Sequence, residues 1–179
     1  MPAILRELPF FDYDTTVEAG GIRHQVLARQ HVLWVSLSHQ GLRELGQGTP
    51  PFPVIYDTGF TGAFLIHQDQ LRRFAGLVPE HLSGLNAMMR PHGRRVPMHA
   101  ANLWLHPNRR GERDMFSGAA PLLLEVHRGV GICGDPDGYP RLPLIGPLAF
   151  RPAGLEICID HAKCRINART PRRFWLFWE

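Results

Sequence analysis

The residues best suited to chemistry lie in the segment Pro53–Ile66, PVIYDTGFTGAFLI, where an apolar run ends at a carboxylate. Asp57 directly follows residues expected to form a buried strand. A carboxylate in that position is costly unless it is hydrogen-bonded or paired. Thr58 and Gly59 supply a hydroxyl group and an unobstructed backbone N–H beside it. The segment therefore predicts a carboxylate that its own loop holds in place.

The run Asp57–Gly62, Asp-Thr-Gly-Phe-Thr-Gly, resembles the signature of the retropepsin-like aspartic proteases. In that family two or three apolar residues precede Asp-Thr/Ser-Gly, and here Val54–Tyr56 fill those positions. A second family element, an apolar pair followed by Gly, is matched by Leu144–Gly146. The resemblance covers roughly residues 32–171. It implies an all-β fold, with a closed β-barrel and one or two short helices.

The resemblance also implies the chemistry of an aspartic endopeptidase, with Asp57, Thr58 and Gly59 as its catalytic residues. In that family two carboxylates share one proton, because like charges so close cannot both ionise, and the pair activates a water against a peptide carbonyl. This chain has one Asp-Thr-Gly and no Asp-Ser-Gly. The resemblance therefore implies a homodimer in which Asp57 is contributed twice across a two-fold axis. It implies neither a cofactor nor a metal.

By the same resemblance, further residues should lie against the substrate, which would be a peptide or a protein. They are Phe60, Thr61, Gly62, Gly93, Ile145 and Gly146. Gly93 is the candidate for the tip of the hairpin flap that the family folds over its substrate, although the family's Gly-Gly tip is absent. Thr58 would hydrogen-bond to its twin across the axis, and the Gly59 N–H would donate to the Asp57 carboxylate.

The elements that must position these residues are short strands. The 18 Gly and 16 Pro are evenly spread, and the apolar stretches between them are about four to eight residues long, as in all-β proteins. Two segments, His67–Phe74 and Pro79–Leu85, have the pattern of short helices. Strands are expected over Ile22–Arg29, His31–Ser38, Phe52–Asp57, Gly62–Ile66, Val96–Leu105, Pro121–His127, Leu142–Ile145, Leu155–Asp160, Cys164–Ala168 and Phe174–Trp178.

The length of 179 residues and the 44% hydrophobic content predict one domain over residues 1–179. Residues 1–30 would be an N-terminal extension or the first strands. Residues 172–179 would form an aromatic strand at the dimer interface or over the barrel. No apolar run approaches the roughly 18 residues that span a bilayer, and the start lacks the layout of a signal peptide. We therefore expect a cytoplasmic protein without a membrane partner.

Three other patterns indicate alternative chemistry. The run Gly129–Gly134 matches the G-x-G-x-x-G of dinucleotide sites, but the Asp- and Pro-rich residues after it cannot open the required helix. Cys158, His161 and Cys164 offer three zinc ligands where a structural site wants four. The basic stretch Lys163–Arg173 is followed by aromatic residues and could contact nucleic acid.

Two alternatives to a protease stay open at this point. One is a non-catalytic dimer of the same fold that binds peptides or serves as a scaffold. The other, which we favour least, is a nucleic-acid-binding module that uses the basic C-terminal region. The charge distribution bears on the second, because residues 90–179 carry 13 Arg and 1 Lys against 8 acidic residues. The scaffold alternative predicts that Asp57→Asn leaves function intact.

Overall fold

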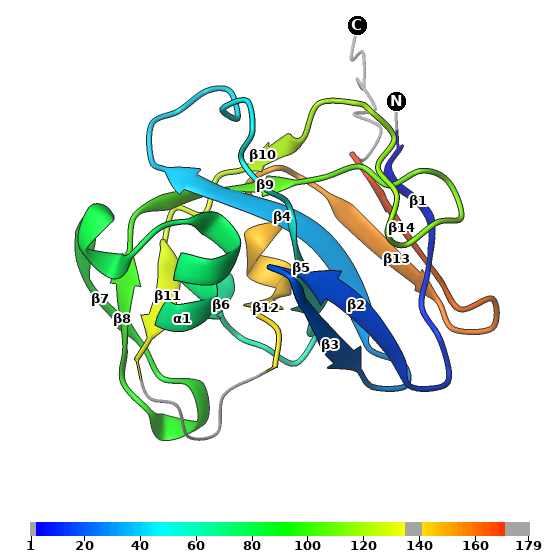
Figure 1. Cartoon of the computed structure of the whole chain (residues 1–179), viewed down its shortest axis with the longest axis horizontal. Coiled ribbons are helices and arrows are strands. Elements are labelled where there is room, and N and C mark those ends of the chain that lie inside the picture. The colour runs from blue at the N-terminus through cyan, green and yellow to red at the C-terminus, as the bar shows by residue number, and fades with distance from the viewer. Residues whose placement is uncertain (1–2, 135–140, 171–179) are drawn as a thin grey trace, which may run out of the picture.

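The computed structural model describes residues 3–134 and 141–170, and a nine-stranded sheet is its largest element (Figure 1). The spatial order of this sheet is β10-β9-β4-β5-β12-β6-β11-β8-β7. Its strands are β4 (His31–His39), β5 (Phe52–Tyr56), β6 (Phe64–His67), β7 (Gly84–Met89), β8 (Val96–His99), β9 (Ala101–Leu105), β10 (Leu122–Leu124), β11 (Val130–Cys133) and β12 (Leu144–Ile145).

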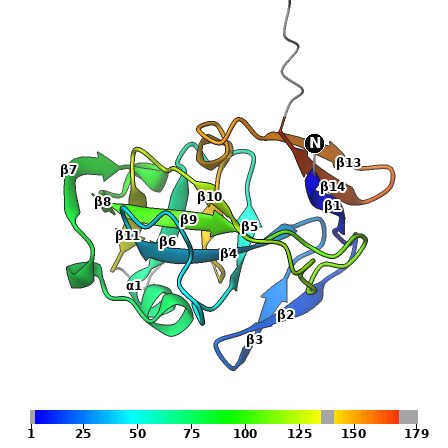
Figure 2. The same ribbon diagram turned by 90° about the horizontal axis from the view of Figure 1, so that it is seen from above.

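Two smaller sheets complete the β structure. The strands β1 (Ala3–Pro9), β14 (Arg165–Arg169) and β13 (Glu156–Asp160) form an antiparallel sheet in that order. The strands β2 (Thr15–Ala19) and β3 (Ile22–Val26) form a separate hairpin. The three-stranded sheet and the β7–β8 hairpin lie at opposite ends of the molecule (Figure 2). Residues 1–30 thus contain the first strands, which was one of the two expectations for them.

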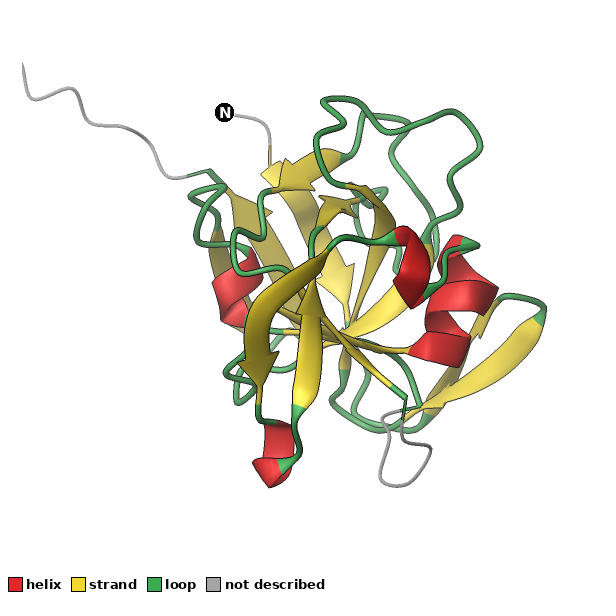
Figure 3. Cartoon of the chain, turned by 90° about the vertical axis from the view of Figure 1, so that its left-hand side faces the viewer, coloured by secondary structure: helices red, strands yellow, loops and turns green. Residues whose placement is uncertain are grey.

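The helical segments are short and lie outside the sheets (Figure 3). Helix α1 (Gln68–Gln70) starts at a capping box on His67 and continues into the π-helical turn η1 (Leu71–Ala75). Three single turns of 3₁₀-helix follow along the chain: η2 (Pro79–His81), η3 (Pro91–Gly93) and η4 (Pro147–Ala149). None of the described helices is long and apolar enough to cross a membrane.

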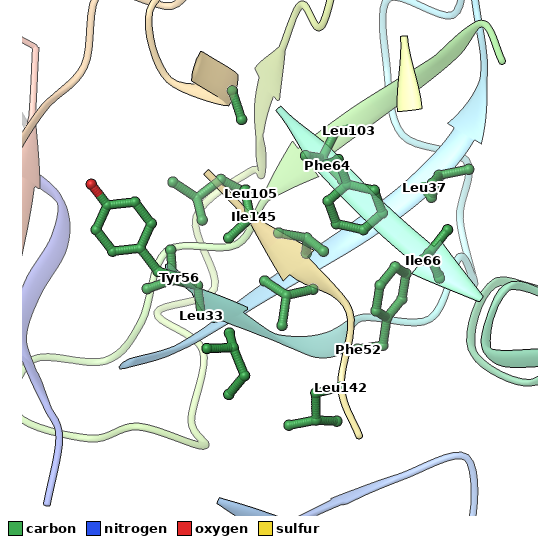
Figure 4. Close-up of a cluster of buried hydrophobic side chains, with 14 of the residues drawn as sticks. Leu33, Leu37, Phe52, Tyr56, Phe64, Ile66, Leu103, Leu105, Leu142 and Ile145 are labelled. Carbon is green, nitrogen blue, oxygen red and sulfur yellow. The ribbon is translucent and has the colours of Figure 1, made fainter. Parts of the chain in front are cut away.

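The apolar core runs from the first strand to the last, with a dense cluster around β4, β5, β6 and β9 (Figure 4). Every residue of β5 is buried, as are all of β6 and β9. A strand covered on both faces has a continuous apolar sequence rather than an alternating one, and Phe52–Tyr56 has that pattern. The cluster fixes the strands on both sides of the Asp57 loop.

The expectation of an all-β fold is confirmed, but the closed barrel is wrong. Within residues 3–134 and 141–170, β10 and β7 are the two edges of the large sheet, and no pairing joins them. The pairing of β7 with β8 shifts register between Gly84 and Met88. Such irregularities bend a strand and disrupt its pairing. Here they occur in the β7–β8 hairpin, which lies at one end of the molecule (Figure 2).

Local expectations have mixed outcomes. The helix expected over His67–Phe74 is confirmed from Gln68 onward, with His67 as the last residue of β6. The helix over Pro79–Leu85 is wrong beyond its first turn, because η2 ends at His81 and the strand β7 begins at Gly84. The single strand expected over Val96–Leu105 is two strands that pair with different partners. The aromatic strand expected over residues 172–179 lies outside the described residues.

Candidate functional site

Asp57 is the first residue after the buried strand β5, and its backbone is fixed by the neighbouring strand β12. The Asp57 N–H donates to the carbonyl oxygen of Ile145 at 3.0 Å, and the Ile55 N–H donates to that of Pro143 at 2.8 Å. Strand β12 runs parallel to β5 and antiparallel to β6. It therefore lies between the two strands that the Asp57 loop connects, so both ends of the loop are bonded to the same short strand.

Gly146 closes this frame at the end of β12. Its N–H donates to the carbonyl oxygen of Ala63 at 3.0 Å. A Cβ atom added to Gly146 would lie within 2.6 Å of the carbonyl oxygens of Phe60 and Gly62. Both oxygens belong to the backbone of the Asp57 loop, so they cannot move aside as a flexible side chain could. The close approach of two backbone segments explains why a glycine follows the apolar pair.

The Asp57 loop holds its carboxylate by a local hydrogen bond. The Gly59 N–H donates to Asp57 Oδ1 at 2.8 Å, as the resemblance implies, and the Phe60 N–H donates to the Asp57 carbonyl oxygen at 3.2 Å. Asp57 is half-buried, whereas Thr58 and Gly59 are exposed. Within the described residues, no donor meets Asp57 Oδ2. One oxygen is thus fixed by the loop and the other can accept a proton or bind a water.

A cavity of about 560 Å³ lies beside the second half of this loop. Phe60–Ala63 form one wall, and the β7–β8 hairpin forms another. Met89 of this hairpin packs against two glycines. A Cβ atom added to Gly62 would lie 2.8 Å from Met89 Cε, and one added to Gly131 would lie 2.5 Å from Met89 Sδ. The Met89 side chain therefore covers two glycines, one in the loop and one in β11. Their missing side chains let the hairpin pack against the site.

The structure brings most of the predicted site residues into one unit. Asp57 and the next five residues form the loop, and Ile145 and Gly146 bind its two ends. Gly93 lies in η3 at the tip of the β7–β8 hairpin, where the sequence placed a flap tip, but it does not line the cavity. Ile145 is 0% exposed and lies in the core (Figure 4). Ile145 and Gly146 thus position the loop, rather than contact substrate as we expected.

Several cavity residues escaped the sequence interpretation. Met88 and Met89 belong to β7, part of which the sequence placed in a helix. Met98 from β8, Leu148 from η4 and Arg128 from the turn before β11 also line the cavity. No local motif marks these residues. Only the fold, which joins segments from five parts of the chain, identifies them as a group.

A second set of reactive side chains lies inside the large sheet. Ser36 Oγ donates to the carbonyl oxygen of Pro50 at 2.9 Å and lies 2.8 Å from His106 Nε2. Burial lowers the pKa of His106 to about 4, so the imidazole is neutral near pH 7. The pair has the residue types of a nucleophile and its base. Ser36 is 0% exposed, however, and no substrate can reach its hydroxyl group.

The weaker sequence patterns have structural roles. Most of Gly129–Gly134 is strand β11, which runs parallel to β6 in the large sheet. Cys158 is on β13 opposite Asn167, and Cys164 is the last residue of the β13–β14 turn. Within the described part of the chain, no group of three or more His, Cys, Asp or Glu side chains could hold a metal ion.

Comparisons with known proteins assign no family. No family model matches the chain, and neither a curated protein nor a solved structure matches it significantly. The case for a function therefore depends on the residues and the geometry described above.

Proposed function

We propose that this chain is an aspartic endopeptidase of the retropepsin-like type, in which two copies each contribute Asp57. The observation that carries the proposal is the insertion of β12 between β5 and β6, which holds a loop with a half-exposed carboxylate at its start and cavity-lining residues in its second half. A structural Asp-Thr-Gly turn would need neither this double backbone anchoring nor an adjacent cavity. The resemblance of Asp57–Gly62 to the family signature agrees with this interpretation.

The reaction divides acid and base work between the two carboxyl groups. The ionised Asp57 takes a proton from a water whose oxygen bonds to the peptide carbonyl carbon, while the protonated Asp57 of the other copy donates its proton to the carbonyl oxygen. As the C–N bond of the tetrahedral intermediate breaks, the nitrogen accepts the proton that the first Asp57 took from the water. The second Asp57 takes a proton from one hydroxyl group, which leaves the carboxylic acid product and returns both carboxyl groups to their starting states. The Gly59 N–H keeps the Asp57 carboxylate oriented throughout.

The need for two copies follows from the chemistry and from the exposure of the loop. One carboxyl group cannot be base and acid at the same step, and the chain has a single Asp-Thr-Gly. Thr58 and Gly59 are exposed beside Asp57, although the strands before and after the loop are buried. A second copy related by a two-fold axis would cover these residues and bring the two carboxyl groups together.

The first experiment compares peptide cleavage by the wild type, Asp57→Asn and Asp12→Asn. A mixed peptide library is read by mass spectrometry from acid to neutral pH. Asp12 is an exposed aspartate that belongs neither to the loop nor to the cavity lining, so Asp12→Asn is the matched control. We expect cleavage by the wild type and the control, and a loss of about 10³-fold or more in Asp57→Asn. Equal cleavage by all three would refute the proposal, and cleavage by none would favour the non-catalytic peptide-binding alternative.

A mixing experiment tests the dimer separately. Wild-type chains are titrated with Asp57→Asn chains at constant total concentration under conditions where subunits exchange. If both carboxyl groups are needed, an equal mixture retains about a quarter of the wild-type activity, because random pairing gives that share of wild-type dimers. Retention of half the activity would mean that each chain acts alone, and would refute the shared site.

A further inference from the structure

The cavity beside the Asp57 loop is apolar and adaptable. Three of its lining residues are methionines, Met88, Met89 and Met98, and Phe60 and Leu148 add further apolar surface. Methionine is unbranched and polarizable, so its side chain adjusts to partners of different shape. This lining suits long or aromatic apolar side chains and does not select one of them sharply.

The rim of the same cavity is basic. Arg90 lies at the end of β7, and Arg128 lies in the turn before β11; both are exposed and line the cavity. Within residues 3–134 and 141–170, neither guanidinium has an ion-pair partner. The ring of His127, which also lines the cavity, has its Nε2 atom 3.7 Å from Glu125 Oε2. None of the described residues that line the cavity is acidic, so among them the two arginines carry a positive charge with no acidic partner.

The hairpin also offers backbone groups to an extended chain. Strand β7 is the last strand of the large sheet in the described part of the protein, so its outer edge has no paired strand. Its pairing with β8 is interrupted between Gly84 and Met88, next to the lining residues Leu85 and Ala87. Peptides commonly bind in extended form along such an open edge, with alternate side chains entering a pocket.

We propose that the cavity binds an extended acidic peptide, with an apolar side chain among the methionines and flanking carboxylates against Arg90 and Arg128. The inference rests on the proposed function in that the peptide is the one to be cleaved. Charge complementarity selects the acidic peptide over a neutral or basic one. Single-stranded nucleic acid fits less well, because its bases need aromatic stacking surfaces, and the described lining offers the rings of Phe60 and His127 alone.

The test measures binding rather than cleavage, using Asp57→Asn so that the peptide stays intact. The probe is a fluorescent peptide with a central Leu-Phe pair flanked by glutamates, and its counterparts have glutamines or lysines instead. We expect the affinity to fall in the order glutamate, glutamine, lysine. Arg90→Gln and Arg128→Gln should each weaken the glutamate peptide about two- to fivefold and leave the glutamine peptide nearly unchanged. Rising salt should reduce the difference between the peptides.

The matched control is Arg23→Gln, because Arg23 is exposed on β3, away from the β7–β8 hairpin that lines the cavity (Figure 1). Equal binding of all three peptides, or equal losses in the rim and control variants, would overturn the inference. Tighter binding of a single-stranded oligonucleotide in competition with the glutamate peptide would also overturn it. Because the readout is binding, a protein that selects the acidic peptide but never cleaves it would refute only the proposed function. Cleavage that is indifferent to flanking charge would refute only this inference.

Discussion

Two regions of this protein carry side chains with catalytic potential, and they differ in access. Asp57 lies on a loop whose two ends are bonded to β12; the residue is half-exposed, and the second half of its loop lines a cavity. Ser36 and His106 form a hydrogen-bonded pair of side chains, which Asp57 lacks among the described residues, but Ser36 is fully buried in the large sheet. Judged by hydrogen-bond geometry alone, Ser36 and His106 would be the better candidates for an active site.

The difference shows what separates a candidate site from a buried polar pair. The Ser36 hydroxyl group also donates to the Pro50 carbonyl oxygen, so it satisfies groups that the sheet has buried. Asp57 has one oxygen bonded to the loop and the other without a donor among the described residues. Rigid backbone combined with unsatisfied, accessible side-chain atoms is what chemistry on an external substrate needs. Substitutions in the frame of the first region and in the polar pair of the second test this difference.

The largest effect should come from Gly146→Ala, which attacks the frame of the Asp57 loop. The backbone of Gly146 has φ −102° and ψ 170°, which alanine adopts readily, so the cost would be steric. Its new methyl group would press on the carbonyl oxygens of Phe60 and Gly62. We expect a loss of roughly 2–3 kcal/mol in the free energy of unfolding, measured by urea denaturation, and a large loss of peptide cleavage.

The control for this variant is Gly84→Ala at the start of β7. A Cβ atom at Gly84 would meet nothing within 4 Å, and its φ is not positive. We expect this variant to unfold within about 0.5 kcal/mol of the wild type. If Gly146→Ala were as stable as the control, the close approach of β12 to the loop would not be a constraint on the fold.

The sequence predicted the strand β5, the Asp57 loop and the strand β6 because their signals are local, whereas the insertion of β12 between the two strands was not predicted. A continuous apolar run, a turn with Asp and Gly and a second apolar run specify β5, the loop and β6 within Pro53–Ile66. The apolar pair before Gly146 then predicts β12 by resemblance. The hydrogen bond from Gly59 to the carboxylate follows from the same few residues.

The sequence interpretation failed where pairing is distant or the composition is misleading. Strand β1 pairs with β14, whose residues lie about 160 positions later, and no local pattern encodes that partner. Strand β7 (GLNAMM) lacks β-branched residues and is a strand because β8 lies beside it. The cavity was missed for both reasons, since it needs β7 and four other segments in place.

Ser36→Ala should have a smaller effect, and on stability alone. It removes the donor to the Pro50 carbonyl oxygen and leaves His106 Nε2 without its buried partner. Such a loss typically costs about 1–2 kcal/mol, which urea denaturation would detect. Peptide cleavage by the folded protein should stay at the wild-type rate. A strong loss of cleavage without a loss of stability would give Ser36 a role in chemistry and erase the distinction drawn between the two regions.

The smallest effect concerns the pH dependence of stability, through His106. Burial lowers the pKa of folded His106 from 6.5 to about 4. Between these values the unfolded chain binds a proton that the folded chain does not, so stability falls as pH decreases from 6.5 toward 4. Because the ring is partly exposed, we expect its share of the free energy of unfolding to be roughly 1 kcal/mol.

His106→Gln should lower the free energy of unfolding at neutral pH and make it less dependent on pH between 4 and 6.5. Some dependence should persist, because burial also lowers the pKa values of His31 and His99. Urea denaturation at several pH values would measure this, and an unchanged pH dependence in His106→Gln would show that the buried pair does not titrate with folding.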